Sequence, residues 1–168
     1  MIIFHGSNVE INSIKLEKCT PYKDFGQGFY VTTIEEQAER MARRTVRRFG
    51  GAPIITIYEF NEIELQELNY KEFKNVNNDW AMFILNNRDK DFKDISNELS
   101  NQDNKYDVVS GAIANDDIAT AFALFRDGIM NLEMLALRLE HKKLSNQYSF
   151  HTQRAIALLR KVGVKRFE

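Results

Sequence analysis

A histidine, a glycine and a serine follow one another near the start of the chain, in the stretch "FHGSN". His5 ends an apolar run, and Gly6 and Ser7 come directly after it. An imidazole can donate and accept hydrogen bonds, and a glycine leaves the adjoining backbone groups uncovered. These three residues could therefore bind a polar ligand at the edge of a sheet.

Two glycines and a tyrosine form a second candidate, in the stretch "DFGQGFY". Gly26 and Gly28 allow positive φ angles and let a ligand come close to the main chain, while Tyr30 supplies a flat aromatic face. As a phosphate loop the stretch is weak, because it precedes a strand and lacks the third glycine of a dinucleotide fingerprint. On spacing alone, a glycine-kinked turn into a core strand is the simpler interpretation.

A row of arginines comes next, at the spacing i, i+3, i+4, i+7 and i+8 that places residues on one face of a helix. The row comprises Arg40, Arg43, Arg44, Arg47 and Arg48, and the opposite face carries Ala38, Met41, Ala42, Val46 and Phe49. We therefore expect the arginines to face outward, with Glu36 as the one acidic residue beside them. They form either an ordinary solvated face or a contact for phosphate groups or an acidic partner protein.

Strands and helices that could position these residues are readable from their patterns. Strands are expected at Ile2–Phe4, Gly28–Thr33, Pro53–Phe60, Tyr106–Ile113 and Gln147–His151. Helices are expected at Ile34–Arg48, Trp80–Asn87, Asp116–Asp127, Asn131–Leu139 and Thr152–Lys161, the first with a capping box of Thr33 and Glu36. The polar segment Asn86–Lys105 reads as a mobile loop or insertion. Because strands and helices do not alternate regularly, we expect an α+β fold.

The composition is that of one ordinary globular domain spanning residues 1–168, with 43% hydrophobic and 28% charged residues. A net charge of -1 gives no overall attraction to nucleic acid or to an anionic membrane. Cys19 is the only cysteine, so no disulfide can form within the chain. We expect a cytoplasmic protein without a metal site, since His141 and His151 have no partners at metal-ligand spacing.

Three stretches together, "HGS", "FGQGFY" and the late "NQYSF", resemble the His-Tyr-Glu signature of the ADP-ribosyltransferase fold. This branch is typified by poly(ADP-ribose) polymerases and diphtheria toxin. The stretches "FHGSN", "KDFGQGFYVTTIEEQAERMA", "NNR" and "YDVVSGAIANDD" are similar to the small bacterial "domain of unknown function 3990" family, itself considered ADP-ribosyltransferase-like. The resemblance covers nearly the whole chain. It implies a split antiparallel β-sheet core with flanking helices, with NAD bound between two sheets.

The resemblance also assigns roles to single residues. His5 would bond the ribose next to the adenine, the Gly6 backbone would hold the nicotinamide amide with support from Ser7, and Tyr30 would stack on the nicotinamide. Other residues implied to line the NAD site are Phe25, Gly26 and Gly28. Candidate contacts for the acceptor or for phosphate are Arg43, Arg44, Arg47 and Arg88. Arg88 and the segment "SGAIANDD" have alternative interpretations, as a helix-terminal charge and as a turn before a helix.

The third position of the family pattern is usually a glutamate, and here the matching residue is Gln147. An amide can bond a ribose hydroxyl, but it carries no charge and cannot act as a base at neutral pH. Polymer formation is therefore not favoured. Transfer of a single ADP-ribose stays open, with or without help from a carboxylate such as Glu140 or the Asp116-Asp117 pair. A plain strand glutamine is the alternative.

These expectations amount to an NAD-dependent mono-ADP-ribosyltransferase that releases nicotinamide. Its acceptor would be a protein or a nucleic acid, and by analogy it would be the toxin of a bacterial pair with an antitoxin protein, without a membrane partner. Two other functions fit the same residues. One is a non-catalytic module that binds NAD or ADP-ribose, and the other is a protein-interaction domain with a vestigial site.

Overall fold

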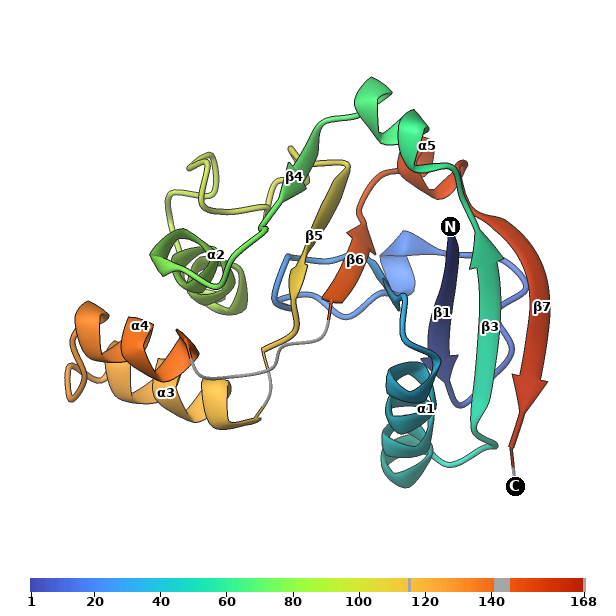
Figure 1. Ribbon diagram of the computed structural model, residues 1–168, viewed down its shortest axis with the longest axis horizontal. Coiled ribbons are helices and arrows are strands. Elements are labelled where there is room, and N and C mark those ends of the chain that lie inside the picture. The colour runs from blue at the N-terminus through green and yellow to red at the C-terminus, as the bar shows by residue number, and fades with distance from the viewer. Residues whose placement is uncertain (115, 141–145, 168) are drawn as a thin grey trace.

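The computed structural model describes residues 1–114, 116–140 and 146–167, and within them the fold is α+β, as predicted (Figure 1). Seven strands form one sheet in the order β4-β5-β6-β2-β1-β3-β7. The strands are β1 Ile2–Ser7, β2 Phe29–Thr32, β3 Ile54–Glu59, β4 Tyr70–Glu72, β5 Val108–Ala112, β6 Asn146–Phe150 and β7 Arg160–Arg166. All neighbouring strands are antiparallel except β4 and β5, which form a short parallel pair at one edge.

The sheet separates into two halves between its central strands. β1 pairs with β3 at every residue from Ile2 to Ser7, and β2 pairs with β6 from Phe29 to Thr32. β1 and β2, in contrast, pair only at Phe4 and Thr32. Figure 1 shows the result, with β1, β3 and β7 on one side and β4, β5 and β6 on the other. Residues of β1 that follow Phe4 therefore have a backbone edge that β2 does not cover.

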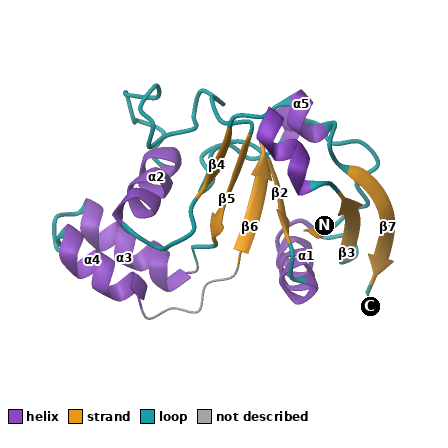
Figure 2. Cartoon of the chain, turned by 45° about the horizontal axis from the view of Figure 1, so that its top comes forward, coloured by secondary structure: helices purple, strands orange, loops and turns teal. Residues whose placement is uncertain are grey.

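Helices pack against both halves of the sheet (Figure 2). They are α1 Glu35–Phe49, α2 Asn78–Arg88, α3 Asp116–Arg126, α4 Leu132–Glu140 and α5 Gln153–Ile156, with 3-10 turns at Leu16–Lys18 and Glu62–Glu67. α1 lies against β1, where Gly6 allows a close approach: a Cβ on Gly6 would come within 2.8 Å of the Ala38 carbonyl carbon and 2.9 Å of the Ala42 nitrogen. Any larger residue would force α1 away from the sheet.

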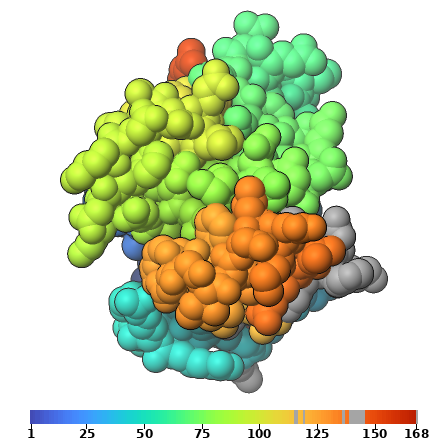
Figure 3. Space-filling view, turned by 90° about the vertical axis from the view of Figure 1, so that its left-hand side faces the viewer, coloured from blue at the N-terminus to red at the C-terminus, as the bar shows by residue number. Residues whose placement is uncertain are grey.

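Two hydrophobic clusters lie on opposite faces of the sheet. The first packs α2, α3 and α4 together against β5, around Phe25, Trp80, Phe83 and Leu135. Figure 3 shows α3 and α4, in orange, lying against the α2 segment on that side of the molecule. The second joins β1, β2, β3, β5 and β6 on the other face, around Ile3, Phe29, Val31, Tyr58 and Phe150. It holds the two halves together where their backbones separate.

All five predicted strands occur, but the predicted helix Thr152–Lys161 is wrong. Thr152 does cap a helix, since its Oγ1 accepts a hydrogen bond from the Ala155 nitrogen, but α5 ends at Ile156. The chain then enters β7, which pairs with β3 along six positions. Without β7, β3 would be an uncovered edge, and the charged pairs at both ends of "RKVGVKR" suit a solvent-facing edge strand.

Two details of α1 also differ from the prediction. The N-cap residue is Ile34, and no side chain caps the first turn. The Thr32 hydroxyl, just before the helix, accepts from the Ile34 nitrogen and donates to Gln37 Oε1 at 2.6 Å. The capping box of Thr33 and Glu36 is therefore not formed. Met41 and Phe49, expected to face the core, are 46% and 67% exposed. Small residues, Ala38 and Ala42, make the buried face instead, because the helix lies so close to β1.

The segment Asn86–Lys105, predicted to be a mobile loop, is tied to α2 by its own side chains. Asn86 Nδ2 donates to the Leu99 carbonyl at 2.8 Å, and Gln102 Nε2 donates to the Asn86 carbonyl at 2.7 Å. Asn101 is fully buried and bonds Asn87 through its backbone nitrogen. The polar residues that suggested mobility are those that anchor the loop.

Candidate functional site

His5 lies where the two halves of the sheet separate. Its Nδ1 is 2.7 Å from the Tyr30 carbonyl oxygen, and its ring stacks on Phe29 with centroids 4.3 Å apart and planes inclined by 25°. Continuing the pairing of Phe4 with Thr32 would place Gly6 opposite Tyr30. The Tyr30 carbonyl is bonded by the His5 imidazole instead, so a side-chain hydrogen bond replaces the backbone pairing at this point.

The protonation of His5 follows from this contact. A carbonyl oxygen only accepts hydrogen bonds, so Nδ1 carries the proton and donates it. Burial lowers the pKa of His5 below its ordinary value, against a smaller raising effect of the Tyr30 hydrogen bond, so the ring is neutral at pH 7. Nε2 then bears a lone pair, and no described residue donates to it. His5 thus offers a fixed hydrogen-bond acceptor.

Tyr30 is held through its hydroxyl group, which makes two hydrogen bonds. Its hydroxyl donates to the Gly26 carbonyl at 2.8 Å and accepts from the Phe25 nitrogen at 2.9 Å. Burial raises the pKa of this hydroxyl well above its ordinary value, and the Asp24 carboxylate adds to the effect. The ring lies against the first cluster, 6.4 Å from the ring of Phe25. Tyr30 therefore fixes the glycine turn as well as offering an aromatic face.

The turn residues have distinct roles. Gly26 has a positive φ of 96°, as predicted, and a Cβ there would lie 2.8 Å from the Asn101 carbonyl oxygen. Gly28 does not have a positive φ. Gly28 is needed for a different reason: a Cβ at this position would lie 2.5 Å from His151 Nδ1, too close for the two atoms to coexist. Phe25 is fully buried, so its ring supports the turn and is not open to a ligand in this structure.

Gln147 lies at the start of β6, next to β2. It pairs with Thr32, and Ser149 pairs with Tyr30, so Gln147 and Tyr30 share one face of the sheet, whereas His5 packs with Phe29 on the other. Only 7% of Gln147 is exposed. Its Nε2 donates to Asp24 Oδ2 at 3.4 Å. No described residue donates to Oε1.

Asp24 and Arg88 form an ion pair beside Gln147 that the sequence did not predict. Arg88 Nε and Nη2 donate to Asp24 Oδ1 at 2.9 and 2.6 Å. The side chain of Asp24 is 14% exposed and that of Arg88 31%. Arg88 was predicted as a phosphate or acceptor contact, and in the structure it pairs with Asp24. Their sequence separation of 64 positions explains why no local pattern links the two.

The structure thus brings His5, Tyr30 and Gln147 to three strands around the split of the sheet, with the edge of Gly6 beside them and Ser7 buried at the end of β1. His5 Nε2 and Gln147 Oε1 are both hydrogen-bond acceptors, which suits a ligand that offers hydroxyl groups. Neither group carries a charge. Because His5 packs on the opposite face from Tyr30 and Gln147, a ligand that contacts all three has to pass through the split between β1 and β2. Gln147 itself cannot remove a proton.

The family model described as "Protein of unknown function (DUF3990)" matches residues 1–160 of the chain. The chain belongs to this family. Its match includes His5, Tyr30 and Gln147. No curated protein and no solved structure matches the chain.

The arginine row of this DUF3990 member faces outward, as predicted. All five arginines of α1 are exposed. The expectation that Glu36 alone balances them is wrong, because Arg43 pairs with Glu39 at 2.8 Å. Arg48 lies over the exposed ring of Phe49, 5.0 Å from its centroid, and Arg43 lies over the half-buried ring of Phe167 at 5.9 Å. The α1 face therefore combines cations with aromatic rings.

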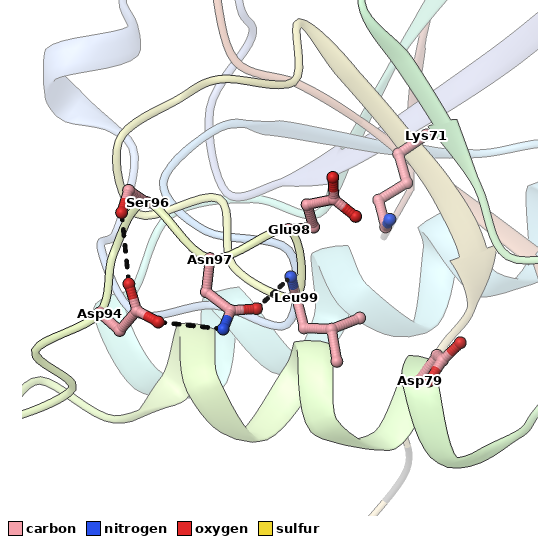
Figure 4. Close-up of a pocket in the computed structure, with 7 residues that line it drawn as sticks. All are labelled: Lys71, Asp79, Asp94, Ser96, Asn97, Glu98 and Leu99. Carbon is pink, nitrogen blue, oxygen red and sulfur yellow. Dashed lines mark hydrogen bonds between the residues drawn. The ribbon is translucent and has the colours of Figure 1, made fainter.

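An open hollow of about 650 Å³ lies elsewhere, beside α2 (Figure 4). It is lined by Lys71, Asp79, Asp94, Ser96, Asn97, Glu98 and Leu99. Its loop is folded on itself, with Asp94 accepting from Ser96 and from Asn97. None of the predicted site residues lines this hollow, so it is distinct from the candidate site.

Other predicted residues can be placed only in part. The side chains of Glu140 and Asp116, and all of His141, lie outside the described residues, while Asp117 is exposed on α3. Within the described ranges, no three His, Cys, Asp or Glu side chains gather as metal ligands would. The helices of those ranges include none that is both long and apolar enough to cross a membrane.

His151 makes stability depend on pH. It is 3% exposed, accepts from or donates to Ser149 Oγ at 2.7 Å through Nε2, and bonds the Gln27 carbonyl at 2.8 Å through Nδ1. Burial lowers the pKa of His151 from 6.5 to about 4. In the unfolded chain His151 becomes protonated as the pH falls below 6.5, whereas in the folded chain it stays neutral until about pH 4. The free energy of unfolding therefore decreases as the pH drops through this window.

We expect the free energy of unfolding, measured with urea, to be about 2 kcal/mol lower at pH 5 than at pH 7.5. His151→Asn keeps a donor for the Gln27 carbonyl and cannot titrate, so it should lose much less over the same interval, although it starts less stable. Equal pH dependence of both proteins would contradict this assignment.

Proposed function

We propose that this DUF3990 member is an NAD-dependent mono-ADP-ribosyltransferase. The observation that carries the proposal is the neutral His5 at the split of the sheet, with Nδ1 bonded to the Tyr30 carbonyl and Nε2 available as an acceptor. The resemblance of "HGS", "FGQGFY" and "NQYSF" to the His-Tyr-Glu signature supports the same function.

The residues fit a ribosylated dinucleotide. NAD supplies an ADP-ribosyl group with nicotinamide as its leaving group. His5 Nε2 and Gln147 Oε1 accept hydrogen bonds from ribose hydroxyls, and the Gly6 edge, which β2 leaves uncovered, offers backbone groups to a carboxamide. The Tyr30 ring holds a flat heterocycle in place. Because Gln147 is neutral, the acceptor supplies its own nucleophilicity, which favours transfer of a single unit.

The acceptor and the cellular role are also part of the proposal. The cations and rings of α1, Arg43, Arg44 and Arg47 among them, provide a contact for a nucleic-acid or acidic protein acceptor. Incubation with labelled NAD, followed by nuclease or protease digestion, tells these acceptors apart by which treatment removes the label. We assign the protein the role of a toxin that an antitoxin restrains. The test compares the growth of bacteria that express the protein with and without the product of a neighbouring gene.

The sharpest test separates the two nitrogens of His5. His5→Asn keeps a donor at the Nδ1 position for the Tyr30 carbonyl and removes the Nε2 acceptor, because an asparagine amide nitrogen lies close to where Nδ1 lies. We expect nicotinamide release to fall roughly a hundredfold while unfolding stays cooperative. Any growth inhibition on expression should fall with it.

Ile3→Val is the matched control, since it removes one methyl from the same face of β1 and costs about 1 kcal/mol. It should release nicotinamide at the wild-type rate. Full activity in His5→Asn would refute the assignment of His5. A wild-type protein that binds NAD in calorimetry without releasing nicotinamide would instead identify the second candidate, a binding module, which the neutral Gln147 favours.

A further inference from the structure

Asp24 is a fixed hydrogen-bond acceptor that connects three elements of the fold. Its Oδ1 accepts two hydrogen bonds from Arg88, at the end of α2. Its Oδ2 accepts from Gln147 Nε2 on β6 and from the Ala114 nitrogen after β5, both at 3.4 Å. The loop that carries Asp24 is in turn held by the Tyr30 hydroxyl. The carboxylate therefore has little freedom to move.

The two oxygens of Asp24 have different partners, and this decides how Gln147 is oriented. Arg88 occupies Oδ1, so Oδ2 is the oxygen that faces Gln147. A carboxylate can only accept, so the NH₂ end of the Gln147 amide must point toward it. The carbonyl end, Oε1, then points the other way, where no described donor meets it.

We propose that Asp24, braced by Arg88, is a positioning residue that turns the Gln147 amide so that Oε1 faces the ligand. This inference rests on the proposed function for the identity of the ligand, a ribose with free hydroxyls. A glutamate offers an acceptor oxygen whichever way it turns, but an amide offers an acceptor at one end only. A glutamine can serve at this position only if a neighbour fixes its orientation, and Asp24 supplies that neighbour.

The orientation itself is testable without NAD. In ¹⁵N-labelled protein, the side-chain amide signals of Gln147 are assigned by their disappearance in Gln147→Glu. We expect their protons to exchange with solvent more slowly than those of Gln66, which is exposed. In Asp24→Asn, whose amide can donate as well as accept, the Gln147 signals should shift and exchange faster. Unchanged signals would overturn the proposal.

Function provides the second measurement. The Kd for NAD should rise about tenfold in Asp24→Asn. Asp24→Glu retains a carboxylate and should recover part of the affinity and of the amide protection. Asp107→Asn is the matched control, because Asp107 is likewise a carboxylate of low exposure that pairs with an arginine, Arg154. It should lower stability and leave both the Gln147 signals and the Kd for NAD unchanged.

The outcomes separate this inference from the proposed function. If the wild-type protein neither binds nor cleaves NAD, the proposed function fails, while the amide signals still decide whether Asp24 orients Gln147. If the wild-type protein cleaves NAD and Asp24→Asn matches it in both amide signals and Kd, the inference alone fails. If Asp24→Asn does not fold, the exchange of the Gln147 side-chain amide protons in the wild type and in Asp24→Glu is the test. Slow exchange in both supports the inference, and exchange as fast as that of Gln66 in both overturns it.

Discussion

Gly6→Ala is expected to destabilise the protein by about 3 kcal/mol or more, lowering the melting temperature by roughly 6–12 °C. A Cβ at this position would overlap the Ala38 carbonyl oxygen and lie 2.9 Å from the Ala42 nitrogen. Both neighbours are backbone atoms of α1, so no side-chain rotation can relieve the overlap. The whole helix would have to move away from β1, opening the contact on which it packs.

The control for this substitution is Gly163→Ala on β7. There an added Cβ would meet only the Ile57 side chain, at 3.4 Å, and Gly163 has no positive φ. We expect a change within about 1 kcal/mol, because the contact is an ordinary one. Urea unfolding of the three proteins at pH 7.5 makes the comparison. Equal loss in both variants would mean that α1 does not depend on Gly6 for its position.

Gly6 also illustrates what the sequence could predict and what it could not. The stretch "FHGSN" marked Gly6 as a residue with uncovered backbone, and the sheet does leave its edge open toward β2. The close approach of α1 was not foreseeable, because it depends on Ala38 and Ala42, more than thirty residues along the chain. These two small residues form the buried face of α1, whereas the larger Met41 and Phe49 are exposed.

The elements that were predicted well are those with a strong local pattern. β3 and β6 are runs of β-branched and aromatic residues, and α1 and α2 begin and end near their predicted residues. β7 was not predicted. The helix predicted to end at Lys161 overlaps its first two residues, and its charges stand in pairs on either side of "VGV", without the alternation that marks a half-buried strand. Asp24 was missed because its partners, Arg88 and Gln147, come from distant parts of the chain.

Gln147→Ala is expected to lower nicotinamide release roughly a hundredfold, because the acceptor that orients the ligand is lost and reaction rates depend steeply on such positioning. Asp24 would keep its ion pair with Arg88, so the fold should stay cooperative. Nicotinamide release and acceptor labelling are measured separately. Wild-type behaviour in both assays would make Gln147 a plain strand residue, and Asp24 would then be the first carboxylate to test.

Gln147→Glu should behave differently, because its carboxyl group would replace an amide that lies 3.4 Å from Asp24 Oδ2. Two carboxylates this close cannot both ionise freely, so one pKa of the pair is raised above the ordinary value. With a shared proton, the new side chain resembles the amide and donates to Asp24. Once that proton is lost, repulsion turns the charged group toward the ligand, where it stabilises positive charge as nicotinamide leaves. We therefore expect nicotinamide release at least equal to wild type, with a ratio to wild type that increases as pH rises from 6 to 9. A ratio independent of pH, with amide signals of Asp24→Asn also unchanged, would mean that Asp24 does not act on this position.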